Sequence, residues 1–465
     1  MRVVVLGAGP GGYVAAIKAA QLGAQVAVVE SREVGGVCLN WGCIPTKTLV
    51  ASAELLMKLK EVESFGIDIS GTPSANLEKM MLRKNKVIDV QVKGIRGLFK
   101  SWGVEIAEGR GSLRKGAGPV PSVVVEKDGQ ERTLEADKII IATGSRPASI
   151  PVFPFDGENI LSSDNALTIK SIPKSIIIVG AGVIGSEFAC IFNALGTEVT
   201  MVELMDRAVS TEDLEVSELL EREFKKRKIK LHKGISIQKV EKGPDGVRAF
   251  TADGREFAAE KMLVSIGRTL NTENMGLEDA GVEKGKRGEI VVDEKMETSV
   301  KGVYAIGDCT GKIMLAHVAS TQGVVAAKNA CGKDAAMDYM TVPAAIFTSP
   351  EIASVGLREF QAKDKGIAYR TGRFQYRALG KAHAIGEITG FVKVLAEEGT
   401  DKIIGAHIIG AHSSDMIHEF AIAMKNGLTA RQVAGTIHAH PTLAEGIMEA
   451  CEALHGEAIH APKEK

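Results

Sequence analysis

The sequence predicts an α/β protein built from two Rossmann-like units and a separate α+β domain at the C-terminal end. The chain of 465 residues exceeds what one hydrophobic core usually fills. A strand, a glycine turn, a helix and a second strand occur in succession twice, and short strands alternate with helices from about residue 343 onward. We therefore expect a first unit over residues 1–149 and 272–342, a second over 150–271, and a C-terminal domain over 343–465.

The first unit opens the chain. Its expected elements are, in order, a buried strand (Val3 to Leu6), a glycine turn (Gly7, Gly9 and Gly12), a helix (Tyr13 to Leu22) and a second strand (Gln25 to Val29) that ends at Glu30. Such a turn lets backbone amides and a helix N-terminus approach a pyrophosphate, and the acid can bind ribose hydroxyls. The unit is therefore predicted to bind a dinucleotide.

The second unit repeats this order. Its expected elements are a strand (Ile176 to Val179), a glycine turn (Gly180, Gly182 and Gly185), a helix that ends near Leu195, and a strand (Glu198 to Val202) followed by Glu203. Glu203 would repel a ribose 2′-phosphate, which favours NAD over NADP. Arg207 is the nearest cation, and an ion pair with Asp206 at a helix start is the alternative role for it. Either glycine triplet alone could be a structural turn, but two complete units indicate two dinucleotide sites.

The remaining pattern completes the domains. The expected helices are Ser52 to Lys60, Leu77 to Leu98, Ser414 to Asn426 and Leu443 to Leu454. The expected strands are Ile139 to Ala142, Val303 to Ile306, Phe391 to Leu395 and Ile403 to Ile409.

Composition narrows the function classes. The formal charge is -1, from 57 Lys plus Arg against 58 Asp plus Glu, so no global field attracts nucleic acid or anionic lipid. The sequence shows neither a charged leader nor an apolar run long enough to span a membrane, so we expect a cytoplasmic protein. Its six cysteines are too few for a secreted disulfide scaffold, and only Cys38 and Cys43 lie close together. We expect Cys190, Cys309, Cys331 and Cys451 to be buried small residues.

The strongest signal is the segment from Gly35 to Lys47, which contains Cys38 and Cys43. In a regular helix these cysteines would have α-carbons roughly 8–9 Å apart, beyond the ~7 Å that a disulfide tolerates. A bridge between them therefore needs a distorted turn, which Gly42 permits. The segment resembles the active-site motif of the pyridine nucleotide-disulfide oxidoreductases, and within that family it is most similar to the dihydrolipoyl dehydrogenases.

The resemblance covers nearly the whole chain and implies FAD and NAD as cofactors. The segment from Thr298 to Asp308 resembles the family's second flavin fingerprint, so the first unit would hold FAD and the second NAD. By the same likeness, the FAD site would include Gly7, Gly9, Gly12, Glu30, Lys47, Thr143, Gly144, Asp308, Ala316 and His317. The NAD site would include Gly180, Gly182, Gly185, Glu187, Glu203 and Gly267. Glu187 would neighbour Lys47, although it could instead be an ordinary first-turn acid on its helix.

A base is also implied near the C-terminal end. His440, Pro441, Thr442 and Glu445 match the family's His-Pro-Thr-x-x-Glu pattern, with His440 as the base and Glu445 as its orienting carboxylate. An imidazole held by an acid can take up the proton that thiol-disulfide exchange releases. In the family this pair faces the cysteines of the other subunit, so the likeness implies a homodimer whose C-terminal domain serves dimerisation.

The implied reaction is oxidation of protein-bound dihydrolipoyl groups, with electrons passing through Cys38 and Cys43 and FAD to NAD. The partner would be a lipoylated acyltransferase of a 2-oxoacid dehydrogenase complex or a lipoylated glycine cleavage H protein. Glutathione and trypanothione-type reductases run the reverse direction from NADPH and would need cations where Glu203 lies. Mercuric reductase usually carries a C-terminal cysteine pair, which residues 461–465 lack. A non-catalytic scaffold would leave the cysteines and base unexplained. The sequence assigns no role to His383, His412 and His418, and no spacing indicates a metal site.

Overall fold

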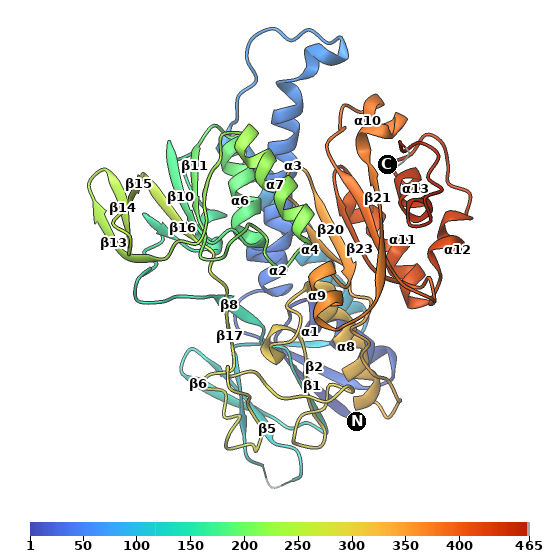
Figure 1. Ribbon diagram of the computed structural model, residues 1–465. Helices are drawn as coiled ribbons and strands as arrows, with labels where there is room; N and C mark the ends of the chain where they lie inside the picture. Colours follow the sequence, from blue (N-terminus) through green and yellow to red (C-terminus); the bar gives the residue numbers. More distant parts are fainter. Residues whose placement is uncertain (117, 463–465) are drawn as a thin grey trace.

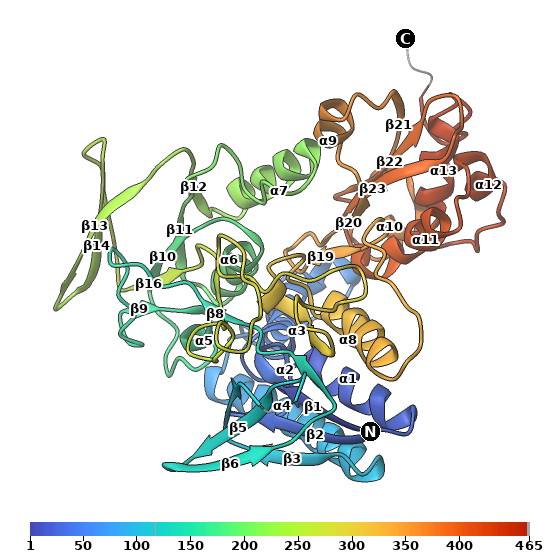
Figure 2. The same cartoon turned by 90° about the horizontal axis from the view of Figure 1, so that it is seen from below.

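The computed structural model describes residues 1–116 and 118–462, arranged as three sheet-centred bodies around long central helices (Figures 1 and 2). The N-terminal body lies at the bottom of Figure 1, the second nucleotide unit at the left and the C-terminal sheet at the right. Helices α3 (Cys43–Leu59) and α4 (Leu77–Ser101) run between them. The predicted α/β fold class is confirmed.

The N-terminal body is built on a five-stranded parallel sheet in the order β18-β7-β1-β2-β3. Its strands are β1 (Arg2–Leu6), β2 (Gln25–Glu30), β3 (Glu105–Glu108), β7 (Lys138–Ile141) and β18 (Val303–Ala305). Apolar side chains of β1 and β7 are buried on both faces, as expected for a parallel sheet covered by helices. Helices α1 (Pro10–Gln21) and α8 (Ala316–Ala330) pack together against it.

The second unit repeats this design with the parallel order β12-β11-β10-β16-β9. Its strands are β9 (Ile160–Leu161), β10 (Ser175–Val179), β11 (Glu198–Val202), β12 (Lys230–His232) and β16 (Lys261–Val264). The helices are α5 (Ser163–Ala166), α6 (Val183–Ala194) and α7 (Leu214–Lys226). α6 is almost wholly buried, which explains its apolar sequence.

The C-terminal body centres on an antiparallel sheet in the order β19-β20-β23-β22-β21. Its strands are β19 (Ala344–Ile346), β20 (Ile352–Gly356), β21 (Tyr369–Gln375), β22 (Phe391–Glu397) and β23 (Ile403–Ile409). The helices are α9 (Glu359–Asp364), α10 (Gly380–Ala384), α11 (Ser413–Lys425), α12 (Ala430–Ala434) and α13 (Glu445–Ala453).

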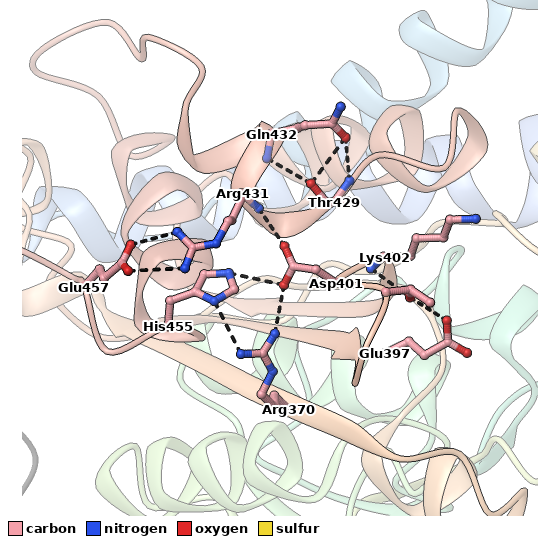
Figure 3. A network of polar contacts seen from close by, with 10 residues as sticks. Arg370, Glu397, Asp401, Lys402, Thr429, Arg431, Gln432, His455 and Glu457 are labelled. Atoms are coloured by element: carbon pink, nitrogen blue, oxygen red, sulfur yellow. Dashed lines mark hydrogen bonds and ion pairs between the residues drawn. The ribbon is translucent and has the colours of Figure 1, made fainter.

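A polar network fixes the edge of this body around Asp401, in the turn between β22 and β23 (Figure 3). Asp401 accepts hydrogen bonds from the Arg370 guanidinium at 3.1 Å and the Arg431 backbone N–H at 3.0 Å. Arg431 also forms a bidentate ion pair with Glu457, beyond the end of α13, and His455 lies 3.2 Å from Asp401. The network therefore ties α12 to the sheet and to the chain that follows α13.

Two features differ from the sequence-based expectation. The helix expected from Ser52 begins earlier, at Cys43, because Gly42 ends the preceding helix α2 (Gly36–Trp41) and the chain turns directly into α3. The antiparallel sheets β4-β5-β6 and β13-β14-β15 were not predicted; strands β6 and β13 are mostly exposed and polar, and the apolar positions of β5 and β14 are few and flanked by charged residues. Their strands are β4 (Arg110–Arg114), β5 (Ser122–Lys127), β6 (Gln130–Leu134), β13 (Ile237–Gly243), β14 (Gly246–Thr251) and β15 (Glu256–Ala259).

Short elements complete the chain. They are the pair β8 (Ser145–Pro147) and β17 (Arg268–Leu270) and the 3₁₀ turns Val62–Phe65, Gly307–Thr310 and Tyr376–Ala378. Among the described residues, no helix combines the length and the apolar character that a membrane crossing requires.

Candidate active site

Both glycine turns are shaped for close backbone approach. A β-carbon on Gly12 would lie 1.9 Å from the Gly7 carbonyl oxygen, and one on Gly185 would lie 1.9 Å from that of Gly180, so neither position has room for a side chain. The helices that follow, α1 and α6, have no side-chain N-cap and no acidic residue in their first turns. Their first amides are therefore free to bind an anion such as a pyrophosphate.

The two predicted ribose acids lie in matching positions. The Glu30 carboxylate accepts hydrogen bonds from the backbone N–H groups of Ala8 and Arg32, both at 2.8 Å. The Glu203 carboxylate accepts from Ala181 at 2.5 Å and Met205 at 2.7 Å. Each acid is thereby fixed beside its own glycine turn, where ribose hydroxyls of a bound dinucleotide would lie.

Arg207 is engaged elsewhere. Its guanidinium lies 3.5 Å from the Asp206 carboxylate and donates to the Ser210 carbonyl at 2.8 Å. The expected ion pair with Asp206 is present, although it lies in a loop and not at a helix start, since α7 begins only at Leu214. These bonds occupy the cation that could otherwise have bound a 2′-phosphate.

The carboxyl edge of the N-terminal sheet gathers the other predicted flavin residues. Because β1, β7 and β18 are parallel neighbours, the glycine turn, Thr143 and Asp308 emerge at one edge. Thr143 donates to the Asn271 carbonyl at 2.7 Å, and Gly144 takes a positive φ of 67°. Ala316 begins α8, and the exposed His317 ring contacts the Pro343 carbonyl at 2.8 Å.

Asp308 has two polar neighbours that were not predicted as site residues. Ser145 donates to its carboxylate, and the Arg268 guanidinium lies 3.7 Å from the same oxygen and 2.6 Å from the Ser145 hydroxyl. The antiparallel pairing of β8 with β17 brings these two residues together. Ser145 and Arg268 each follow a glycine that comes three residues after a buried strand. That pattern is the sequence signal that could have identified them. Gly267 lies just before Arg268, at the carboxyl edge of the second sheet.

The cysteine segment packs directly against the first glycine turn. The Gly35 N–H donates to the Ala8 carbonyl at 2.8 Å, and a β-carbon on Gly36 would lie 2.6 Å from the α-carbon of Gly9. This close contact explains the glycine pair that precedes Cys38. It places the cysteines beside the turn that is shaped for a dinucleotide.

The two cysteines lie on different helices, Cys38 within α2 and Cys43 at the start of α3. Gly42 separates them with φ -144° and ψ -113°, which breaks the helix as the spacing predicts. The Gly42 carbonyl accepts from the Thr46 hydroxyl at 2.6 Å, so the break is held in place. Both cysteines are half-buried free thiols in this structure.

The environment distinguishes the two thiols. A hydrogen bond with the Cys38 thiol lowers the pKa of Cys43 to about 7, aided by the Lys47 charge and opposed by burial and Glu187. The same hydrogen bond, together with burial, raises the pKa of Cys38. When the reduced pair loses one proton, Cys43 therefore becomes the thiolate, and the Cys38 thiol keeps its proton and donates it in a hydrogen bond to Cys43.

Lys47 connects the cysteine segment to the second unit. Its ammonium donates to both Glu187 oxygens at 2.9 Å and lies 4.6 Å from the centre of the Phe347 ring. Glu187 is buried in α6 and also accepts from the Phe347 N–H at 2.9 Å. It lies beyond the first turn of its helix, so the alternative of a first-turn acid is wrong.

His440 and Glu445 form the expected pair. The His440 Nδ1 atom lies 2.8 Å from one Glu445 oxygen, and the other oxygen accepts from the Thr442 N–H at 2.9 Å. Burial opposes ionisation of Glu445, but the bonds to Thr442 and His440 lower its pKa. The His440 side chain is 76% exposed. Across the described part of this chain, no hydrogen bond or ion pair joins the pair to Cys38 or Cys43.

The remaining cysteines and histidines lie outside this site. Cys190, Cys309 and Cys451 are buried as expected, and burial raises the pKa of Cys190 and Cys309 to about 11, so both are poor nucleophiles at neutral pH. Cys331 is only half-buried, contrary to expectation, because it caps the C-terminal end of α8 at the surface. His383, His412 and His418 are exposed.

Comparison with known proteins agrees with this geometry. Residues 1–323 match the pyridine nucleotide-disulphide oxidoreductase family, and residues 342–451 match the dimerisation domain of that family. The dihydrolipoyl dehydrogenase of Chlamydia muridarum is 43% identical over 99% of this chain and 98% of its own. That of Bacillus subtilis is 43% identical over 98% of each. The crystal structure of LpdA from Mycobacterium tuberculosis superposes with a TM-score of 0.92, at 32% identity over 98% of this chain and 99% of its own. The chain therefore belongs to the pyridine nucleotide-disulfide oxidoreductase family.

Proposed function

We propose that the protein oxidises dihydrolipoyl groups to the lipoyl disulfide and passes the electrons through Cys38 and Cys43 and FAD to NAD. The observation that carries this proposal is the position of the cysteine segment. It packs against the first glycine turn, and Lys47 joins it to Glu187 of the second unit. A redox pair at the junction of two dinucleotide units can pass electrons to the first dinucleotide, and through it to the second.

FAD belongs to the first unit in this proposal. The turn of Gly7, Gly9 and Gly12 would hold the pyrophosphate, Glu30 would bind the adenosine ribose, and Asp308 would bind the ribityl chain. Thr143, Gly144, Ala316 and His317 would line the same site, and Lys47 would face the flavin ring. FAD would supply the two-electron chemistry that links the dithiol to hydride transfer to NAD. NAD belongs to the turn of Gly180, Gly182 and Gly185, with Glu203 at the ribose and Glu187 and Gly267 nearby.

Thiol chemistry in the proposal uses His440 as the base. His440 takes the proton of one substrate thiol, and the resulting thiolate attacks Cys38 of the oxidised pair, so that the bond to Cys43 breaks and Cys43 leaves as a thiolate. The second substrate sulfur then displaces Cys38 and closes the lipoyl disulfide. Glu445 keeps the imidazole oriented and compensates its charge.

The catalytic unit is a homodimer in which His440 of one subunit serves the cysteines of the other. The exposure of His440 and the match of residues 342–451 to a dimerisation domain support this arrangement. Its substrate is carried by a lipoylated partner, either an acyltransferase of a 2-oxoacid dehydrogenase complex or a glycine cleavage H protein. We place the domain boundaries at residues 149/150, 271/272 and 342/343, and the protein in the cytoplasm, where free thiols persist.

The activity test uses the purified protein with dihydrolipoamide. We expect a yellow protein that reduces NAD and not NADP, because Glu203 can bind ribose hydroxyls but repels a phosphate. Equal rates with both coenzymes would contradict the NAD assignment. A protein that instead reduces glutathione disulfide or mercuric ion, and does not oxidise dihydrolipoamide, would show the reaction to be wrong.

Subunit mixing tests the site between subunits. His440→Ala removes a base, which typically costs 10²–10⁴-fold in rate, and Cys38→Ser removes the attacked sulfur, so each variant alone should be nearly inactive. Exchange between the two variants should give heterodimers with one intact site and about half of the wild-type activity per heterodimer. If exchange is confirmed and the mixture stays inactive, the site does not lie between subunits.

A further inference from the structure

A second histidine, His438, lies two residues before the proposed base. Its side chain is buried, whereas that of the base is exposed. His438 and His440 share the loop between α12 and α13, yet the His438 side chain is 5% exposed and that of His440 is 76% exposed. The neighbouring Ile437 is 97% exposed. Ile437 therefore contributes little apolar contact to hold this part of the loop, and the buried His438 side chain lies beside it.

Both ring nitrogens of His438 contact oxygen atoms. Nδ1 lies 2.8 Å from the Thr436 carbonyl oxygen, and Nε2 lies 2.8 Å from a carboxylate oxygen of Glu419. The ring is therefore held at both nitrogens, by the backbone of its own loop and by a side chain of helix α11.

Glu419 belongs to a rigid part of the C-terminal body. It lies on α11, whose residues Ile417 and Phe420 are buried in the core beneath the sheet. The start of the loop is held by the Asp401 network at α12 (Figure 3), and its end by the Thr442 and Glu445 bonds at α13. The hydrogen bond between His438 and Glu419 is a third attachment of the loop. It is the nearest attachment on the N-terminal side of the exposed His440.

We propose that His438, through Glu419, is a positioning residue for the base His440. It fixes the backbone from which His440 projects, so that Nε2 of His440 faces the partner subunit while Nδ1 stays bonded to Glu445. This inference rests on the proposed function. His438 touches neither substrate nor cysteine and acts only through the geometry of His440.

The expected effect follows from the sensitivity of proton transfer to distance. A misplacement of about 1 Å can cost 10²-fold in rate, so His438→Ala should lower turnover of dihydrolipoamide with NAD by about 10- to 100-fold. Reduction of ferricyanide by NADH should be unchanged, since ferricyanide accepts single electrons and needs no thiol base. A general loss of folding would lower both reactions together.

Four further variants sharpen the test. His438→Gln keeps an amide donor near the place of Nε2 and should recover part of the dihydrolipoamide activity. Glu419→Ala should reproduce the loss, and the double variant should lose little more than either single one, because both remove the same contact. His418→Ala is the matched control. His418 precedes Glu419 on α11 but is exposed, and its one hydrogen-bond contact with the described residues is to the Asp415 carbonyl, at 3.3 Å, so its removal should change neither reaction.

The outcomes separate this inference from the proposed function. A wild-type protein that does not oxidise dihydrolipoamide overturns the proposed function, and the inference that rests on it. With an active wild type, full activity in His438→Ala overturns the positioning role alone. Equal losses in the dihydrolipoamide and ferricyanide reactions also overturn it, since they would show a structural role only.

Discussion

Two lysines bind carboxylates of the second nucleotide unit, and their surroundings differ sharply. Lys393, on β22 of the C-terminal sheet, has a side chain that is 2% exposed and donates to Asp213, Glu215 and Glu359. Lys47, at the start of α3, is 29% exposed and has a single carboxylate partner, Glu187. Both join separate bodies of the molecule, but only Lys47 lies close enough to a cysteine to affect its pKa.

The difference separates a structural charge from a functional one. Burial opposes the charge of Lys393, but hydrogen bonds to its three carboxylates raise its pKa, so it remains an ammonium ion at any physiological pH. Those carboxylates lie close enough together to hold a metal ion, and the Lys393 ammonium occupies that place. Lys47 instead pairs with Glu187, and its charge lowers the pKa of Cys43.

The largest expected effect is on stability, from Lys393→Met. The substitution leaves the buried Asp213 carboxylate and the partly exposed Glu359 carboxylate without the Lys393 ammonium, and breaking a buried ion pair in this way costs about 3–5 kcal/mol. Urea unfolding of the purified protein measures the change. Lys363→Met on the exposed face of α9 is the control and should stay within about 0.5 kcal/mol of the wild type. A Lys393→Met protein within about 1 kcal/mol of the wild type would show that the cluster is not structural.

The next effect is on chemistry, from Lys47→Met. The Lys47 charge lowers the pKa of Cys43, so its removal should raise that pKa above about 7 and shift the appearance of the thiolate to higher pH. A single neighbouring charge typically contributes about one pH unit or more. The pH midpoint of the long-wavelength absorbance of reduced enzyme, which requires a thiolate beside the flavin, measures the shift. An unchanged midpoint would show that Lys47 does not control Cys43.

The sequence predicted some of these contacts and missed others for a physical reason. His440 and Glu445 are only five residues apart, and the break at Gly42 follows from the spacing of two cysteines. Both features could therefore be predicted from a short stretch of sequence. The Lys393 cluster joins residues from α7, α9 and β22 that lie far apart in sequence. Charged residues usually indicate an exposed face, and only packing of the folded chain shows that this lysine is buried.

The bounds of individual strands and helices give the same lesson. Strands β11 and β23 have the predicted bounds because their apolar runs end sharply at glycine or acidic residues. Helix α3 was predicted to begin nine residues too late, since its first turns carry the polar and reactive side chains of the site instead of a regular apolar stripe. Ser145 and Arg268 were missed as neighbours of Asp308 because they meet only through the pairing of β8 with β17.

The smallest expected effect comes from Glu187→Gln and has the opposite sign to that of Lys47→Met. The Glu187 charge raises the pKa of Cys43, so a neutral amide should lower it and move the thiolate midpoint down, by less than about one pH unit. The amide oxygen can still accept the Phe347 N–H, so the packing of α6 should persist. In the double variant with Lys47→Met the two opposing charges are both absent, and the midpoint should return toward the wild-type value. An upward shift in Glu187→Gln alone would mean that Glu187 acts on Cys43 chiefly by holding Lys47 in place. The functional role of the Lys47–Glu187 pair would then depend on where Lys47 lies, and not on the charge of Glu187.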